Sequence, residues 1–151
     1  METTTRIRGG MSKCLAAVAA LLIAMLCLSL FPSSAHASIV QSGDLSDSVS
    51  WSLDDQGNLL IAPKNGVSGS FSRETDLDDD WPWDTPQVRP LIQTATVSSG
   101  VTVTDDTRTM FQYCENLTSV DLSGLNTSSV TQMSNMFQLC TSLTSANLDI
   151  S

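Results

Sequence analysis

The chain has 151 residues, of which 41% are hydrophobic, and a formal net charge of −9 at pH 7. This length allows a single domain, and the acidic charge repels polyanions, which excludes nucleic acids and anionic membrane surfaces as partners. The only histidine, His36, lies in a predicted export signal, so the mature chain has no imidazole for a Ser-His or Cys-His catalytic pair or for a zinc site.

Residues 1–37 have the pattern of a secretory signal peptide. Three basic residues precede an apolar run over residues 14–30, and Ala35-His36-Ala37 places small residues at the −3 and −1 positions of a cleavage site. We therefore predict cleavage after Ala37 and a secreted or cell-surface location. The alternative is an uncleaved membrane anchor, because the apolar run approaches the roughly 18 residues of a spanning helix. Cleavage leaves four basic and fifteen acidic residues, a charge of about −11.

Residues 38–90 are expected to form a leader that precedes the repeats. Residues 38–48 are polar and weakly patterned, which favours a flexible start. Apolar and polar residues alternate over residues 49–53, and a Gly-containing turn separates them from the apolar run at residues 58–62. Two such runs predict a β-hairpin with one buried face. Residues 67–74 are interpreted as a linking loop.

An acidic loop follows in the leader. Asp76, Asp78 and Asp80 have the spacing of the first three ligand positions of an EF-hand. The motif fails further on, because Trp81 occupies the position of the required glycine and Gln87 that of the required glutamate. We interpret this segment as a solvated acidic loop and predict no cofactor. A weak calcium site is the alternative.

Two tryptophans, Trp81 and Trp83, flank Pro82 directly after the acidic loop. They could form an exposed aromatic platform for a ligand. Large aromatic side chains more often contribute buried area, so we favour a plug that folds back over the end of a core.

A 26-residue repeat begins at Met110. Residues 136–151 repeat residues 110–125 with eight identities in 16 positions, and repeats of such length indicate stacked coils. Residues 92–97 carry a degenerate version of the same apolar pattern. We therefore divide residues 91–151 into one degenerate, one full and one partial coil. This is fewer than the roughly three repeats that a solenoid needs, so we expect a truncated gene product or fragment.

The repeat unit predicts the structure of one coil. Leu117, Val120 and Leu122 have the L-x-x-L-x-L spacing of a leucine-rich repeat, in which a short strand points Val120 and Leu122 inward and Asp121 outward. Residues 110–114 are expected to form a single helical turn on the opposite side. The predicted fold is mostly β, with a hairpin leader followed by a short leucine-rich-repeat-like solenoid of parallel strands and helical turns. Neighbouring coils must stack to bury their apolar faces.

Cys114 and Cys140 occupy equivalent positions in adjacent coils, which places them within reach of a disulfide. We favour free buried thiols, because a thiol is a good small apolar group. A disulfide is one alternative, and a soft-metal site with Met110 and Met136 is another.

The segment MFQYCENLTSVDLSGLNTSSVTQMSNMFQLCTSLTSANLD resembles the repeats of BspA-like leucine-rich-repeat surface proteins of bacteria, whose general form is MF-x-x-C-x-x-L-T-S-x-D-L-S. The match runs through Met110, Phe111, Cys114, Leu117, Thr118, Ser119, Asp121, Leu122, Ser123, Thr127, Ser128, Val130, Thr131, Met133 and Ser134. The hairpin and the Trp-Pro-Trp segment also look like the leader of these proteins. The resemblance implies a secreted or cell-surface solenoid, in some members linked to adhesion, coaggregation or binding of host proteins. It implies no catalytic residues.

We therefore expect a non-enzymatic interaction module that adheres to host or neighbouring cells through a protein or glycan, without nucleic acid and without membrane contact beyond the export signal. The candidate binding face consists of outward residues of two coils: Thr118, Asp121, Ser123, Thr144, Asn147 and Asp149. The alternative is a structural spacer or N-terminal cap of a longer repeat ectodomain. Glycoside chemistry by a pair such as Asp78 and Asp80 is the least favoured reading.

Overall fold

The computed structural model describes residues 37–77 and 80–148. Residues 1–36 of the predicted signal peptide lie outside this part, so export stays a prediction. Where the chain is described, none of its helices has the length and apolar character needed to cross a membrane.

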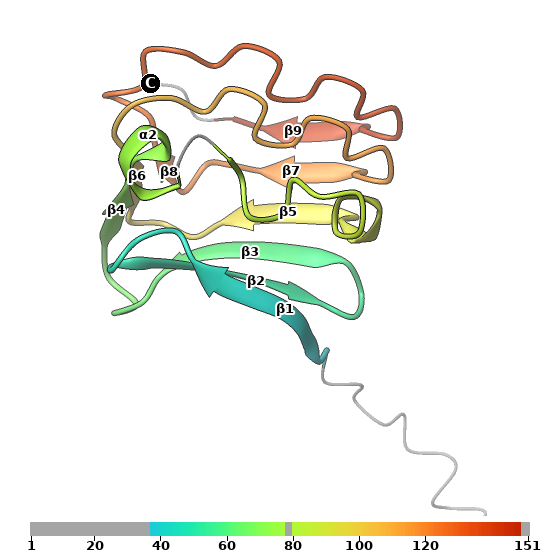
Figure 1. Ribbon diagram of the computed structural model, residues 1–151, viewed down its shortest axis with the longest axis horizontal. Coiled ribbons are helices and arrows are strands. Elements are labelled where there is room, and N and C mark those ends of the chain that lie inside the picture. The colour runs from blue at the N-terminus through green and yellow to red at the C-terminus, as the bar shows by residue number, and fades with distance from the viewer. Residues whose placement is uncertain (1–36, 78–79, 149–151) are drawn as a thin grey trace, which may run out of the picture. The chain divides into compact units, whose positions relative to one another are not determined.

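Nine strands in the described residues form two sheets (Figure 1). The larger sheet has the order β1 (Ile39–Asp44), β2 (Val49–Asp54), β3 (Asn58–Pro63), β5 (Thr94–Val97), β7 (Ser119–Asp121) and β9 (Ser145–Asn147). The smaller has the order β4 (Gly69–Phe71), β6 (Val101–Val103) and β8 (Leu125–Asn126). Two short helical segments accompany them, α2 (Arg73–Asp76) and the 3-10 helix η1 (Arg89–Leu91).

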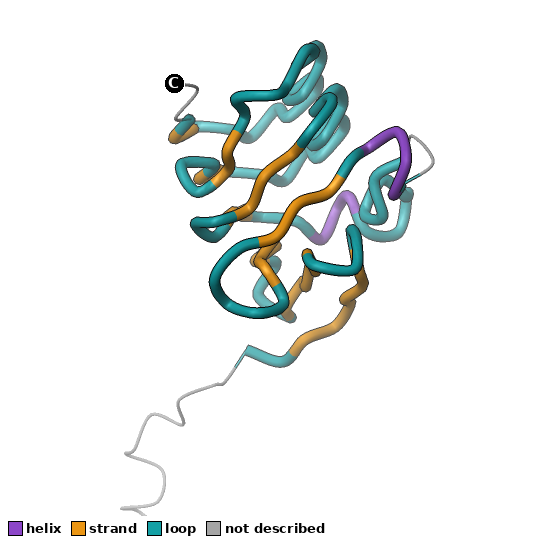
Figure 2. The backbone as a smooth tube through the Cα atoms, turned by 90° about the vertical axis from the view of Figure 1, so that its left-hand side faces the viewer, coloured by secondary structure: helices purple, strands orange, loops and turns teal. Residues whose placement is uncertain are grey.

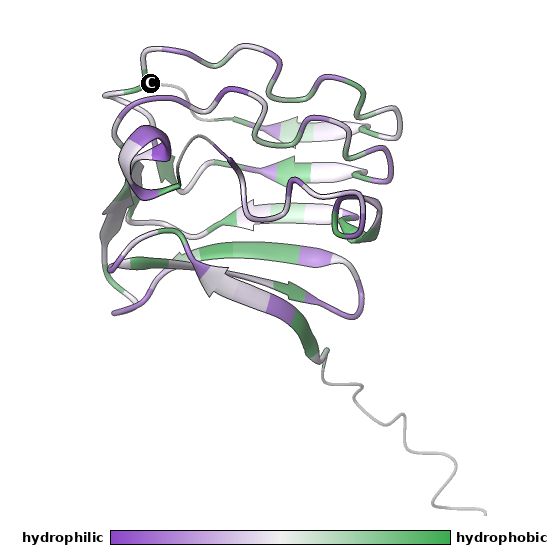
Figure 3. Cartoon of the chain, viewed as in Figure 1, coloured by the Kyte–Doolittle hydropathy of each residue, from purple (hydrophilic) through white to green (hydrophobic). Residues whose placement is uncertain are grey.

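The predicted hairpin is confirmed. Strands β2 and β3 pair antiparallel, with Trp51 opposite Ile61. Val49, Trp51 and Leu53 are buried and their neighbours are not, so the alternation in the sequence marks a strand with one face in the core. In Figure 3, β3 is coloured as apolar along most of its length.

The prediction of a flexible start at residues 38–48 is wrong. β1 pairs antiparallel with β2 and forms the outer strand of the sheet. Leu45, directly after β1, is buried in the core, and its N–H donates to the carbonyl of Val49. The segment is ordered by backbone pairing with β2, and backbone pairing leaves little trace in side-chain composition.

Residues 67–74 also differ from the predicted loop. They contain β4, which pairs parallel with β6, and the first turn of α2. Phe71 is buried, and Ser72 caps the helix by accepting a hydrogen bond from the N–H of Thr75. β4 is only three residues long and its partner β6 lies about 30 residues further along the chain, so no local sequence pattern predicts this strand.

The coils stack in the predicted register. β3, β5, β7 and β9 are parallel neighbours, and Ala95 of the degenerate coil pairs with Val120, which pairs with Ala146. In the smaller sheet Val101 pairs with Leu125. Figure 2 shows successive coils following the same path. The fold is a leucine-rich-repeat-like solenoid of mostly β structure, and the leader and coils share one apolar core.

The segment expected to form a helical turn is instead a run of tight turns. Thr109 and Tyr113 have positive φ angles of 59° and 63°, and Asn135 and Leu139 repeat them in the next coil at 59° and 62°. A left-handed residue at every fourth position interrupts an α-helix. Every second N–H here donates to the next coil, as that of Phe111 does to the carbonyl of Met136 at 2.9 Å, instead of to a carbonyl in its own turn.

The Trp-Pro-Trp segment closes the first end of this stack. Trp81 and Trp83 are buried, which confirms the predicted plug. Their indole N–H groups donate to the carbonyls of Arg108 at 2.9 Å and Met110 at 2.7 Å. The equivalent carbonyls of the next coil, at Ser134 and Met136, accept from backbone N–H groups. At this end, the indole N–H groups therefore take the place of the backbone N–H groups that a preceding coil would supply.

An aromatic stack accompanies this hydrogen bonding. Trp83 stacks on Phe111 with ring centroids 6.2 Å apart, and Phe111 stacks on Phe137 at 5.8 Å. Phe111 and Phe137 are equivalent residues of the repeat, so Trp83 takes the place that a phenylalanine of a preceding coil would have. Such pairs contribute about 0.5–1.5 kcal/mol beyond the area that they bury.

We expect Trp83→Phe to lower the free energy of unfolding by about 1–3 kcal/mol through the unpaired carbonyl of Met110. Trp51→Phe is the matched control, because the Trp51 indole is buried in the same core and has no acceptor among the described residues. Urea denaturation of both variants measures the difference. Equal losses would show that the indole hydrogen bond does not contribute to closing the stack.

Gly124 lies where two coils approach each other closely. A Cβ atom at this position would lie 2.3 Å from the carbonyl oxygen of Val97 and 2.5 Å from the carbonyl carbon of Ser98, so the backbone must shift to admit it. We expect Gly124→Ala to destabilise the fold by about 1–3 kcal/mol. The exposed Ser129→Ala change should stay within about 0.5 kcal/mol of the parent protein. Thermal or urea unfolding measures the loss of stability in each variant. Equal losses in the two variants would contradict the close approach of the two coils at Gly124.

Candidate functional site

The outward face of the larger sheet carries small polar side chains in two rows. Strand register aligns Thr94, Ser119 and Ser145 in one row. It aligns Thr96, Asp121 and Asn147 in the other. Inward positions between the rows hold Ala95, Val120 and Ala146. The face is therefore a polar surface on an apolar support.

Asp121 is the best-fixed group of the predicted binding face. Its Oδ1 accepts hydrogen bonds from the hydroxyl of Ser123 at 2.7 Å and from the side-chain amide of Asn147 at 3.1 Å. Hydrogen bonds from Ser123 hold the pKa of Asp121 below its ordinary value. The carboxylate is thus ionised at neutral pH and held in one orientation.

The other predicted residues are placed differently. The hydroxyls of Thr118 and Thr144 donate to carbonyls of the preceding coil, those of Gln93 at 2.9 Å and Thr118 at 3.1 Å. They are exposed, but their hydrogen bonds hold adjacent coils together. Asp149 lies outside the described residues.

The sequence-based list of the binding face omitted Ser119 and Ser145. Both belong to the strands and point outward, since the residues that follow them, Val120 and Ala146, occupy the inward positions. Side chains in a strand alternate between the two faces of the sheet, so applying this alternation to every residue of the strands would have predicted that both serines point outward.

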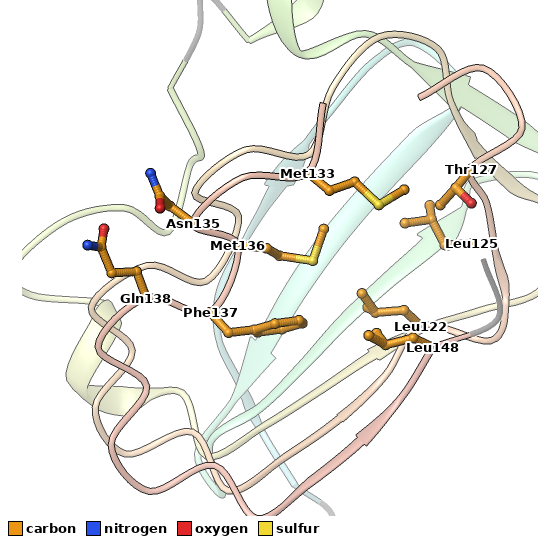
Figure 4. Close-up of a pocket in the computed structure, with 9 residues that line it drawn as sticks. All are labelled: Leu122, Leu125, Thr127, Met133, Asn135, Met136, Phe137, Gln138 and Leu148. Carbon is orange, nitrogen blue, oxygen red and sulfur yellow. The ribbon is translucent and has the colours of Figure 1, made fainter. Parts of the chain in front are cut away.

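A second surface is the face of the last described coil that points away from the first. It contains an apolar cavity of about 390 Å³. In Figure 4 the side chains of Met133, Met136 and Phe137 point toward a group of leucines, whereas Asn135 and Gln138 point away. The lining residues are Leu122, Leu125, Thr127, Met133, Asn135, Met136, Phe137, Gln138 and Leu148.

Equivalent residues of the two coils differ in burial at this surface. Met110 is 1% exposed and Leu122 is 4% exposed, whereas their counterparts Met136 and Leu148 are 8% and 41% exposed. The residue types are the same, so the difference comes from position: the first pair is covered by the following coil. No coil follows the second pair in the described chain, and Leu148 is left exposed.

The chemistry of the cavity is that of a contact surface. Among the described residues, its lining contains no carboxylate, imidazole, amine or thiol that could transfer a proton or attack a substrate. Its two methionines are flexible, polarisable side chains that adapt to a partner's shape.

Cys114 and Cys140 are free thiols, as the favoured interpretation predicts. Cys140 donates to the carbonyl of Phe111 at 3.0 Å. Burial raises the pKa of Cys114 to about 12, so this thiol is protonated at neutral pH and is a poor nucleophile. Within residues 37–77 and 80–148, no three His, Cys, Asp or Glu side chains are grouped to hold a metal ion. Asp78 lies outside these ranges, so the calcium alternative for the acidic loop remains a prediction.

A buried ionic cluster, which no sequence pattern predicts, joins the leader to the first full coil. The carboxylate of Asp106 binds Arg73 at 3.1 Å and Arg108 at 2.7 Å. Asp105 accepts from the backbone N–H groups of Arg73 at 2.9 Å and Glu74 at 2.7 Å, at the start of α2. With every carboxylate oxygen engaged, the cluster is suited to hold segments together.

The pKa values of both carboxyl groups fall below the ordinary value. Burial raises the pKa of Asp106, but hydrogen bonds from Arg108 and the charges of Arg73 and Arg108 outweigh it. Burial likewise raises the pKa of Asp105, and hydrogen bonds from Glu74, Arg73 and Ser72 outweigh that effect. Both groups are therefore ionised at neutral pH.

The fold and these surfaces define the chain as a leucine-rich-repeat-like repeat module. Residues 98–151 match the model of the family described as "Mycoplasma protein of unknown function, DUF285". The chain is also similar to a leucine-rich repeat protein from Eubacterium ventriosum of known crystal structure, at 26% sequence identity and a TM-score of 0.49. That match covers 71% of this chain and 25% of the other, so the chain spans about a quarter of that protein's length. No curated protein matches the chain.

Acid should loosen the junction between leader and coil. The lowered pKa values mean that Asp105 and Asp106 contribute stability at pH values above about 4 and lose it as the pH falls through their folded-state values. We expect Asp105→Asn to cost about 2 kcal/mol at pH 7, with a smaller difference from the parent protein at pH 3. Asp47→Asn, at an exposed position, is the control. Urea denaturation at both pH values checks this, and an equal difference at the two would contradict it.

Proposed function

We propose that the chain is a non-enzymatic interaction module of an exported repeat protein, which adheres to host or neighbouring cells through the outward face of its larger sheet. The observation that carries the proposal is the pair of polar rows on this face. Their members come from three successive strands, and the stack fixes their spacing.

Pre-organisation makes this face suited to recognition. Short side chains such as Ser119 and Asn147 lose little conformational entropy on binding, and Asp121 is already oriented by two hydrogen bonds. Hydroxyl, amide and carboxylate groups hydrogen bond well to the hydroxyls of a glycan or to a polar peptide. The partner class is therefore a glycan or protein at a cell surface.

Two further features support this proposal. The resemblance of the repeat to those of BspA-like surface proteins, together with the signal-peptide pattern of residues 1–37, favours a location outside the cell. The described lining of the apolar cavity has no ionisable side chain, which favours a module without enzymatic activity.

A binding assay with the mature chain, residues 38–151, tests the sheet face. We expect retention on bacterial or host cells or on a glycan array, and at least a tenfold loss in the Asp121→Ala/Asn147→Ala double variant. The Ser128→Ala/Ser129→Ala variant changes exposed residues outside this sheet and should bind like the parent. Retention on no surface, or equal losses in both variants, would argue against the proposal; circular dichroism confirms that each variant is folded.

The closed end of the stack favours a second candidate, an N-terminal cap of a repeat ectodomain. Capping coils of solenoids replace a neighbour by polar or aromatic side chains, and the indoles of Trp81 and Trp83 do so here. If the Trp83→Phe variant were as stable as the parent protein, this candidate would lose its main support.

A further inference from the structure

We propose that the cavity between the 3-10 helix η1 and the first full coil binds one neutral hexose ring. This η1 cavity has a volume of about 310 Å³ and is lined by Pro86, Arg89, Pro90, Tyr113, Glu115 and Asn116. Ligand pockets span roughly 300–1,000 Å³, so a cavity of this size suits a single small ring. It shares no residue with the two polar rows of the larger sheet and therefore does not rest on the sheet-face proposal.

The side chains that the coil contributes to this cavity depart from the repeat. Tyr113, Glu115 and Asn116 are replaced in the next coil by leucine, threonine and serine. The backbone is the same in both coils, with a φ angle of 63° at Tyr113 and of 62° at its counterpart Leu139. All three side chains are exposed. The stacking of coils thus does not account for their identity.

Tyr113 supplies an aromatic surface for a sugar ring. The guanidinium of Arg89 lies over the Tyr113 ring, with Cζ 5.2 Å from the ring centroid, and Arg89 Nε donates to the carboxylate of Asp84. These contacts hold the phenol in one orientation while 42% of Tyr113 remains exposed. The C–H groups of a hexopyranose pack well on such a ring, because their weakly positive hydrogens face its π electrons.

Polar groups surround this aromatic surface. Asn116 Nδ2 donates to the carbonyl of Pro90 at 2.8 Å, which fixes the amide and leaves its oxygen as an acceptor. Within residues 37–77 and 80–148, neither the carboxylate of Glu115 nor the hydroxyl of Tyr113 has a hydrogen-bond or ion-pair partner. A hexose presents an apolar C–H face and hydroxyls along its edge, and this combination matches a ring bordered by carboxylate and amide oxygens.

The charges at the cavity favour a neutral sugar over an anionic one. Arg89 is matched by its ion pair with Asp84, so the Glu115 carboxylate leaves a net negative charge beside the ring. The whole chain is also acidic, with a net charge of −9. Like charge opposes the approach of a uronic acid or a phosphate, whereas the hydroxyls of a neutral hexose can donate to Glu115.

The test titrates the mature chain, residues 38–151, with the methyl glycosides of glucose, galactose, mannose and N-acetylglucosamine. NMR spectra report the amide shifts of each residue. We expect at least one probe to shift the amides of Tyr113, Glu115 and Asn116, with a dissociation constant of about 1–10 mM, as a single ring with few contacts allows. Glucuronic acid should bind at least tenfold more weakly than that probe.

Two variants carry the residues of the next coil, which the same backbone already accommodates. Tyr113→Leu and Glu115→Thr should each weaken binding at least tenfold. Tyr113→Phe keeps the aromatic ring and should retain most of the affinity, and the Asp121→Ala/Asn147→Ala variant of the sheet face should bind like the parent. Unchanged amide shifts far from each substitution confirm that the variants are folded.

The inference is overturned if no neutral probe shifts the amides of the η1 cavity, if Tyr113→Leu binds like the parent, or if glucuronic acid binds more tightly than every neutral probe. Shifts confined to Ser119, Asp121 and Asn147 would place the sugar on the sheet face and likewise overturn it. Failure of the sheet face in the cell-binding assay leaves the shifts at the η1 cavity unchanged, so the two proposals fail separately.

Discussion

Hydrogen bonding between coils at an interval of 25 or 26 residues is the constraint on which the structure depends. Strands pair in parallel on one side of the stack, and alternate N–H groups of the turn segments donate to the next coil on the other. Each bond has a net value of only about 1 kcal/mol. A buried backbone group without a partner costs more, so the bonds fix the register even where they add little stability. Gly124 and the four left-handed residues follow from this register.

The same constraint makes the two ends of the stack unequal. At one end, an antiparallel hairpin continues the sheet, and two indole N–H groups bond to backbone carbonyls that have no preceding coil. At the other, donors and apolar side chains are presented without partners among the described residues. Edges of this kind favour association, and natural proteins cover or block them. The proposed binding face is the outward side of the larger sheet, a surface distinct from the two ends of the stack.

The leader is held to the coils by charge as well as by packing. Asp105 and Asp106 follow β6, and they bind the start of α2 and the guanidinium of Arg73. The fully engaged carboxylates tie a short, isolated helix to the stack. A cluster of this kind favours a structural role, because both carboxylates are already engaged by hydrogen bonds and ion pairs.

The sequence by itself determined the repeat interval, the inward positions Val120 and Leu122, the hairpin and the burial of the two tryptophans. These follow from side-chain periodicity, which is local. Only the tertiary structure decided that residues 39–44 and 69–71 are strands, that the turn segments are not helical, and that Arg73 meets Asp106. These features depend on hydrogen bonds and ion pairs between segments that are distant in the chain, and such contacts leave no periodic pattern. For the same reason the polar face was only partly anticipated, and the open apolar end was not.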